Sequence, residues 1–126
     1  MWIVGLAGLV TISSCGLTTA THTLSGDLQI IDTSQINTSF GSCDTSSSGY
    51  SDISSGGTVT VKNASGTTIG TGTLGDGGTT CDFSFTVSGL PDSTFYSVYI
   101  GGPQRGAQTY SESKLISDNW NISLSL

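Results

Sequence analysis

The residues best suited to bind a ligand lie in two polar loops. Tyr50 and Asp52 belong to the segment Gly-Tyr-Ser-Asp-Ile over 49–53, and Arg105 belongs to a later glycine-rich loop. A guanidinium can hold an anionic ligand through two parallel hydrogen bonds, and loops on a rigid scaffold often carry binding residues. The structural alternative pairs Arg105 with Asp52 or another carboxylate of the chain and packs the Tyr50 ring over the core edge. We favour the structural roles and keep Tyr50, Asp52 and Arg105 as candidate binding residues.

The sequence predicts neither a catalytic arrangement nor a metal site. The one histidine, His22, is expected to be solvated in a tether, so a Ser-His-Asp triad has no base near the folded loops. One His and three widely spaced Cys do not match a zinc motif. Asp44, Asp52, Asp76 and Asp82 could supply oxygen ligands to calcium, but they lack EF-hand spacing, and Asp in such loops usually serves turns. We therefore predict no enzyme activity, no cofactor and no resident metal; a small paired-carboxylate hydrolase is the remaining alternative.

The charge balance excludes two classes of partner. The 126 residues include three Lys and Arg and nine Asp and Glu, for a net charge of −6. A phosphate-binding groove needs clustered basic residues, so we predict no nucleic-acid binding. For the same reason, contact with a membrane is not expected through a polybasic patch.

The beginning of the chain has the features of an export signal. Residues 1–12 form an apolar run that is too short to span a membrane permanently but long enough for the apolar core of a signal peptide. The Ile-Ser-Ser-Cys that follows resembles a bacterial lipobox, which implies that Cys15 becomes the lipidated first residue of the mature chain. We predict a signal peptide over 1–15, a tether over 16–23 and a folded domain over 24–126. The alternative is an ordinary secretory signal that is cut near Ala20. The sequence departs from the usual signal-peptide pattern in one respect, because no Lys or Arg precedes the apolar run.

The two remaining cysteines, Cys43 and Cys81, form one pair. In the oxidising compartment that export implies, they would normally join in a disulfide. The alternative is two buried free thiols.

Short alternating segments separated by turn residues predict an antiparallel β-sandwich, Ig-like or prealbumin-like, of about seven strands. The expected strands are residues 23–32, 57–62, 67–74, 81–87, 95–100 and 120–126. One short helix near the C-terminus is predicted over 111–118, with Ser111 as its N-cap and Leu115 on its inner side. The last strand is expected to place Trp120 in the core with Ile122.

Two resemblances extend this interpretation. Residues 57–66, 83–91 and 95–99 resemble the prealbumin-like sandwich of carboxypeptidase regulatory-like domains and collagen-adhesin B repeats, which implies a non-catalytic stalk, spacer or adhesion module. Several segments taken in order are similar to small secreted or lipid-anchored domains of actinobacteria. That resemblance covers most of the mature chain and implies an exported domain with one disulfide and no assigned activity. Its segments are 49–53, 59–61, 81–85, 95–98, 105–106, 110–111 and the strand at Trp120.

Together these observations predict a monomeric binding or interaction module on the outer face of a bacterial cytoplasmic membrane. It would touch the membrane only through its lipid anchor and bind a cell-envelope protein or glycan. A structural spacer or surface-coat protein without a ligand is the alternative function, and a freely secreted domain is the alternative location.

Overall fold

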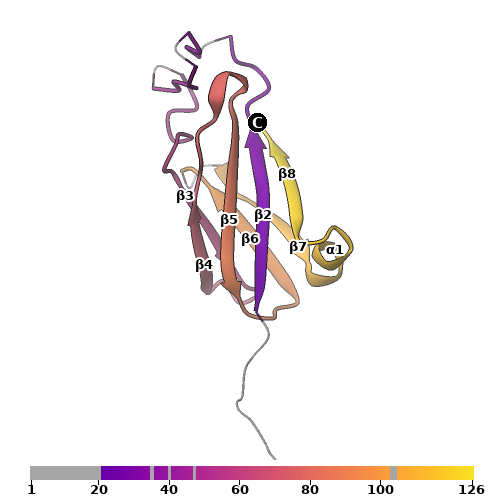
Figure 1. Cartoon of the computed structure of the whole chain (residues 1–126). Helices are drawn as coiled ribbons and strands as arrows, with labels where there is room; N and C mark the ends of the chain where they lie inside the picture. Colours follow the sequence, from indigo (N-terminus) through magenta and orange to yellow (C-terminus); the bar gives the residue numbers. More distant parts are fainter. Residues whose placement is uncertain (1–20, 35, 40, 47, 103–104) are drawn as a thin grey trace, which may run out of the picture.

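A computed structural model describes residues 21–34, 36–39, 41–46, 48–102 and 105–126, which form a β-sandwich of two facing sheets (Figure 1). The predicted signal peptide, Cys15 and residues 16–20 of the predicted tether lie outside the described residues. In the described part of the chain, no helix has the length and apolar character needed to cross a membrane. The strands are β2 (His22–Gln29), β3 (Thr58–Lys62), β4 (Thr68–Thr73), β5 (Asp82–Leu90), β6 (Phe95–Ile100), β7 (Ala107–Ser111) and β8 (Asn121–Ser125), with one 3-10 turn, η1 (Gly78–Thr80), and one helix, α1 (Glu112–Ser117).

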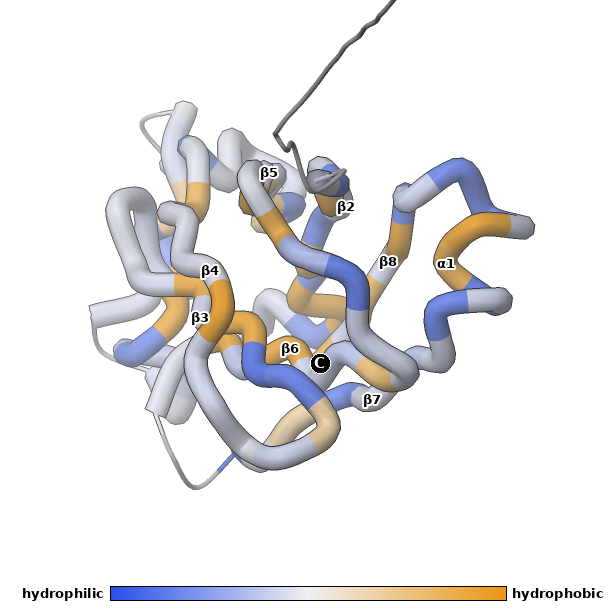
Figure 2. The backbone as a smooth tube through the Cα atoms, turned by 90° about the horizontal axis from the view of Figure 1, so that it is seen from below, coloured by the Kyte–Doolittle hydropathy of each residue, from blue (hydrophilic) through white to orange (hydrophobic). Residues whose placement is uncertain are grey.

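One sheet has the strand order β5-β2-β8 and the other β4-β3-β6-β7. Seen along the strands, the two sheets face each other as separate layers, and α1 lies on the side of β7 and β8 (Figure 2). Alternate side chains of each strand point into the space between the layers, as the burial pattern of β5 shows for Phe83, Phe85 and Val87. The mainly-β sandwich with about seven strands and one short C-terminal helix is confirmed.

One strand pair differs from the predicted antiparallel pattern. β8 pairs with β2 in parallel, with Ser25 opposite Asn121 and Gln29 opposite Ser125. A parallel pair needs a long crossover between its strands, and here almost the whole described domain supplies it. The described strands nearest the two chain ends are therefore neighbours in one sheet.

Two aromatic residues lie differently from their predicted positions. β2 begins at His22, two residues before the expected domain start, and the His22 side chain is only 22% exposed instead of solvated. Trp120 precedes β8 with a positive φ of 57° and is half-buried at the core edge. Its ring stacks on His22 with centroids 4.2 Å apart. This contact between the two rings explains both differences.

The sandwich is closed along the side where β4 meets β5. The Gly75 N–H donates to the Ser84 carbonyl oxygen at 2.7 Å, and Leu74 forms an isolated bridge with Phe85. Close approach of β4 requires glycine, because a Cβ on Gly72 would lie 2.4 Å from the Thr86 carbonyl oxygen. The two sheets thus join at this edge through backbone contacts.

At the opposite side, β7 leads directly into α1. The Ser111 hydroxyl accepts a hydrogen bond from the Lys114 N–H at 3.2 Å, and Leu115 is fully buried. These contacts confirm the predicted N-cap and inner helix face. The sequence predicts no strand over Ala107–Ser111, because the inward positions of β7 are the polar Gln108 and Tyr110 instead of aliphatic residues.

The described residues of the long segment between β2 and β3 form no strand, and a disulfide joins this segment to the core. Cys43 and Cys81 are bonded with their Cα atoms 5.2 Å apart. Further along the segment, Ile53 is fully buried and its carbonyl oxygen accepts from the buried Thr45 hydroxyl at 2.7 Å. The cysteine pair is thus at disulfide distance, as predicted, and the segment covers one end of the sandwich.

We expect the double change Cys43→Ser and Cys81→Ser to lower the free energy of unfolding by about 4 kcal/mol. The bond spans a sequence separation of 38 residues, and the chain-entropy estimate for a loop of this size is of that order. Chemical denaturation of the variant against the parent, both carrying Cys15→Ser, measures the loss. An unfolding midpoint that stays the same after the double change would contradict a stabilising disulfide.

Candidate functional site

Arg105 and Asp52 form a bidentate ion pair between the two polar loops. The Arg105 Nε donates to Asp52 Oδ2 at 2.6 Å, and Nη2 donates to Asp52 Oδ1 at 2.7 Å. The same nitrogen reaches the Gly49 carbonyl oxygen at 2.8 Å, and the Gly102 N–H donates to Asp52 Oδ2 at 2.7 Å. The pair therefore ties the 49–53 segment to the loop that follows β6.

The electrostatics of the pair follow from these bonds. The Arg105 hydrogen bonds lower the pKa of Asp52 to about 2, assisted by the Gly102 N–H and opposed by partial burial. Tyr50 lies under the guanidinium, whose carbon is 5.3 Å from the ring centroid. The structure thus brings Tyr50, Asp52 and Arg105 together, and it does so through the intramolecular pairing that the sequence offered as the structural alternative.

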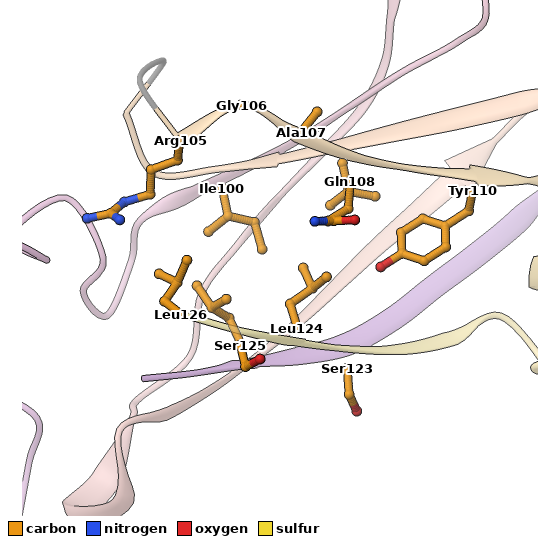
Figure 3. Close-up of a pocket in the computed structure, with 12 residues that line it drawn as sticks. Ile100, Arg105, Gly106, Ala107, Gln108, Tyr110, Ser123, Leu124, Ser125 and Leu126 are labelled. Carbon is orange, nitrogen blue, oxygen red and sulfur yellow. The ribbon is translucent and has the colours of Figure 1, made fainter. Parts of the chain in front are cut away.

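A groove of about 320 Å³ opens between the two sheets at the β7–β8 side. Ile100 of β6, Gln108 of β7 and Leu124 of β8 point into it, whereas the Arg105 guanidinium points away from it (Figure 3). Leu28 and Val98 belong to its apolar lining, and Tyr110 adds a hydroxyl group. Ser123 and Ser125 also line the groove, but their side chains lie on the other face of β8 (Figure 3), where the Ser123 hydroxyl bonds to Asp27. The groove combines an apolar floor with hydroxyl and amide groups at its rim, a composition typical of ligand sites.

The free edge of β8 forms one wall of this groove. Ser25 donates to the Trp120 carbonyl oxygen at 2.9 Å, and Leu126 both donates to Gln29 and accepts from Ile31. The backbone N–H and C=O groups of successive residues point alternately to the two edges of a strand. The even-numbered residues of β8 therefore form the hydrogen bonds with β2. The backbone N–H and C=O groups of Ser123 and Ser125 therefore point to the open side.

The free edge of β7 forms the other wall. The Glu112 N–H donates to the Thr94 carbonyl oxygen at 3.1 Å, and the same register places Tyr110 opposite Tyr96. The hydrogen-bonded pairs of β7 with β6 are therefore the even-numbered ones, and the backbone groups of Ala107 and Thr109 point outward. Within the described residues no backbone hydrogen bond joins β7 to β8.

Arg105, a candidate binding residue from the sequence, lines one end of the groove, whereas the residues along the length of the groove were not predicted. One signal was present: residues 107–111 follow an aromatic strand and place Gln108 and Tyr110 at alternate positions. Polar residues at inward positions of a strand indicate that the sheet face is not covered there. Gln108 is accordingly exposed although it lies on the inner face.

The other aspartates considered for calcium lie apart from one another. Asp44 accepts from the N–H and hydroxyl of Ser46, and Asp76 accepts from the Gly78 N–H at 3.0 Å, so both hold their own turns. Asp82 lies near Asp27 across β5 and β2, and the interaction with that second carboxyl, together with burial, raises the pKa of Asp82. Asp52 is engaged by Arg105. The four residues do not converge on one position.

Comparison of the chain with models of protein families, with curated proteins and with solved structures found no match. The case for function therefore depends on the geometry of the molecule.

We expect Asp52→Asn to lower the free energy of unfolding by about 1–2 kcal/mol near pH 7. The pKa of Asp52 is lowered from 3.8 to about 2 in the folded protein, and the expected loss is reduced because solvent screens this partly exposed pair. A carboxyl group whose pKa is lowered by folding contributes its full stability at pH values above the pKa of the unfolded state. This contribution is lost as the pH falls from about 4 toward 2. Denaturation curves of parent and variant between pH 2 and pH 7 should accordingly converge at the acid end. Asp118→Asn, which removes the exposed pair with Lys114, is the control and should change stability little. Equal stability of parent and Asp52→Asn at pH 7 would argue against a stabilising ion pair.

Proposed function

We propose that this protein is an exported, lipid-anchored binding module that takes up an extended segment of a cell-envelope protein between β7 and β8. One observation carries the proposal: the sandwich is joined at its β4–β5 edge but open at its β7–β8 edge, where a groove of about 320 Å³ lies between two free strand edges. The rest of the scaffold is held by the disulfide and the Arg105–Asp52 pair. A rigid body with one open edge is suited to binding.

An extended peptide is the ligand class that fits two free strand edges. Added strands are held by backbone hydrogen bonds, while alternate side chains enter pockets. Ser123 and Ser125 on one side and Ala107 and Thr109 on the other offer such backbone groups, by the alternation described above. The floor formed by residues such as Val98 and Leu124 would receive the side chains of the peptide.

The lining of the groove argues against the other ligand classes. A glycan site usually presents aromatic platforms, and among the described residues only Tyr110 brings an aromatic ring to the groove. A lipid chain needs an enclosed apolar cavity, whereas this groove is open and carries the polar groups of Gln108 and Tyr110. The charge of Arg105 is neutralised by Asp52, so the groove does not favour an anionic ligand.

Export and anchoring rest on the sequence. The apolar run over 1–12 and the Ile-Ser-Ser-Cys that ends at Cys15 support cleavage and lipidation at that cysteine. A diacylated cysteine would hold the domain on a membrane, because each buried methylene contributes about 0.8 kcal/mol. The disulfide fits an oxidising compartment outside the cytoplasm.

We expect selection from a random peptide library displayed on phage to yield peptides with alternating apolar residues that bind the groove. Ser123→Pro should weaken their binding at least tenfold, because it removes an outward N–H and adds bulk at the β8 edge. Ser123→Ala is the matched control: both variants lose the Ser123–Asp27 side-chain bond, but alanine keeps the N–H and should bind like the parent. Fluorescence anisotropy of labelled peptides measures the affinities. Selected peptides that bind Ser123→Pro and Thr109→Pro as well as the parent would place the site elsewhere.

The intact mass of protein extracted from bacterial membranes tests the anchor. We expect a chain that begins at Cys15, carries a diacylglyceryl group and lacks two hydrogens because of the disulfide. Cys15→Ser should abolish the lipid mass and release the protein from the membrane fraction. A lipid-free parent with a different first residue would contradict anchoring while leaving the groove proposal open to its own test.

A further inference from the structure

Three metal-ligating side chains from distant parts of the chain meet at the end of the sandwich next to α1. His22 begins β2, Asp92 lies in the turn between β5 and β6, and Glu112 begins α1. The His22 Nε2 atom lies 2.5 Å from Asp92 Oδ1 and 4.0 Å from Glu112 Oε2. All three ligand atoms lie within 4.8 Å of one another. One nitrogen and two carboxylates therefore face a common point.

The His22 ring is held in place from behind by Trp120. The two rings are stacked with an interplanar angle of 9°, and Trp120 packs edge-on against Tyr96 with centroids 5.3 Å apart. Asn119 and Trp120 both adopt positive φ, of 56° and 57°, a conformation that is costly for a bulky residue. The backbone strain is thus stored where the indole supports the imidazole.

One buried hydroxyl fixes the turn that carries Asp92 and lies close to Glu112. Tyr96 is fully buried, and its hydroxyl donates to the Pro91 carbonyl oxygen at 2.7 Å and accepts from the Ser93 N–H at 2.8 Å. These bonds fix the turn that carries Asp92. The same oxygen lies 3.4 Å from Glu112 Oε2. Partners of this kind orient metal ligands and limit their movement.

The local charge favours a cation. The chain has three basic residues, and each is engaged elsewhere. Lys62 lies over Tyr99, Arg105 pairs with Asp52, and Lys114 pairs with Asp118. Among the described residues, no Lys or Arg forms a salt bridge with Asp92 or Glu112. Two carboxylates thus share one imidazole, and no permanent positive charge compensates them.

We propose that His22, Asp92 and Glu112 form a binding site for a divalent transition-metal ion of the zinc class. Zinc bonds imidazole nitrogen and carboxylate oxygen at about 2.0–2.2 Å in tetrahedral geometry, so its ligand atoms lie about 3.3 Å apart. The His22–Asp92 and His22–Glu112 distances of 2.5 and 4.0 Å fall on either side of that value. Small rotations of two side chains that are 62% and 33% exposed complete the site, with water as the fourth ligand. The sequence did not predict this site because its ligands share no spacing motif.

Isothermal titration with zinc chloride tests the site in the full-length chain in mild detergent. The parent and every variant carry Cys15→Ser, which removes a thiol that could bind zinc independently. We expect one zinc ion per chain and at least a tenfold weaker affinity in Glu112→Gln and in Asp92→Asn. His22→Phe keeps a flat ring for Trp120 but removes the nitrogen ligand, and should show the same loss. Asp118→Asn, a carboxylate at the other end of α1, is the matched control and should bind like the parent.

Circular dichroism melts establish that each variant is folded before its affinity is compared. As a second measurement, NMR of the parent should show zinc-dependent shifts of the His22 ring and of the Trp120 indole N–H. Absence of zinc binding in the parent would overturn the proposal. Equal binding by parent, Glu112→Gln and His22→Phe, or shifts that leave His22 and Trp120 unchanged, would overturn it as well, because the ion would then be held elsewhere.

Discussion

The asymmetry between the two edges of the sandwich is the constraint on which the rest of the structure depends. Each of the two packed sheets has an edge strand on either side, and an unpaired edge strand exposes backbone N–H and C=O groups without hydrogen-bond partners. On one side the glycines of β4 allow direct approach to β5, and backbone contacts such as Gly75 to Ser84 join the sheets. On the other side β7 and β8 stay apart, and α1 connects them at one end. The groove is the direct consequence of joining one edge and not the other.

The groove keeps its shape because the segments around it are tied to the core. The segment between β2 and β3 forms no strand in its described part, so a sheet does not satisfy the backbone groups there. It is held instead by the Cys43–Cys81 bond, by buried Ile53 and by the ion pair of Asp52 with Arg105. Because Arg105 also lines the groove, the ion pair transmits that rigidity to one end of the site. Tyr50, Asp52 and Arg105, which the sequence analysis kept as candidate binding residues while favouring structural roles, support a neighbouring surface here.

Local sequence patterns determined the features that could be predicted. Alternation in β5 identified its buried face, and Ser111 followed by Leu115 identified the cap and inner face of α1. The Asp52–Arg105 pair was among the stated alternatives because a guanidinium in an acidic chain requires a partner. The remaining features depend on topology: His22 and Asp92 are 70 positions apart, and the parallel pairing of β2 with β8 has no local signal. β7 was missed because its inward residues are polar.

The groove and the proposed metal site are joined through the same short connection. Tyr110 lines the groove and precedes the Ser111 cap, and Glu112 opens α1 directly after it. Trp120 stacks on His22 and leads into β8, the other wall of the groove. An ion that draws Glu112 toward His22 would fix α1 against the start of β2 and with it the spacing of the two free edges.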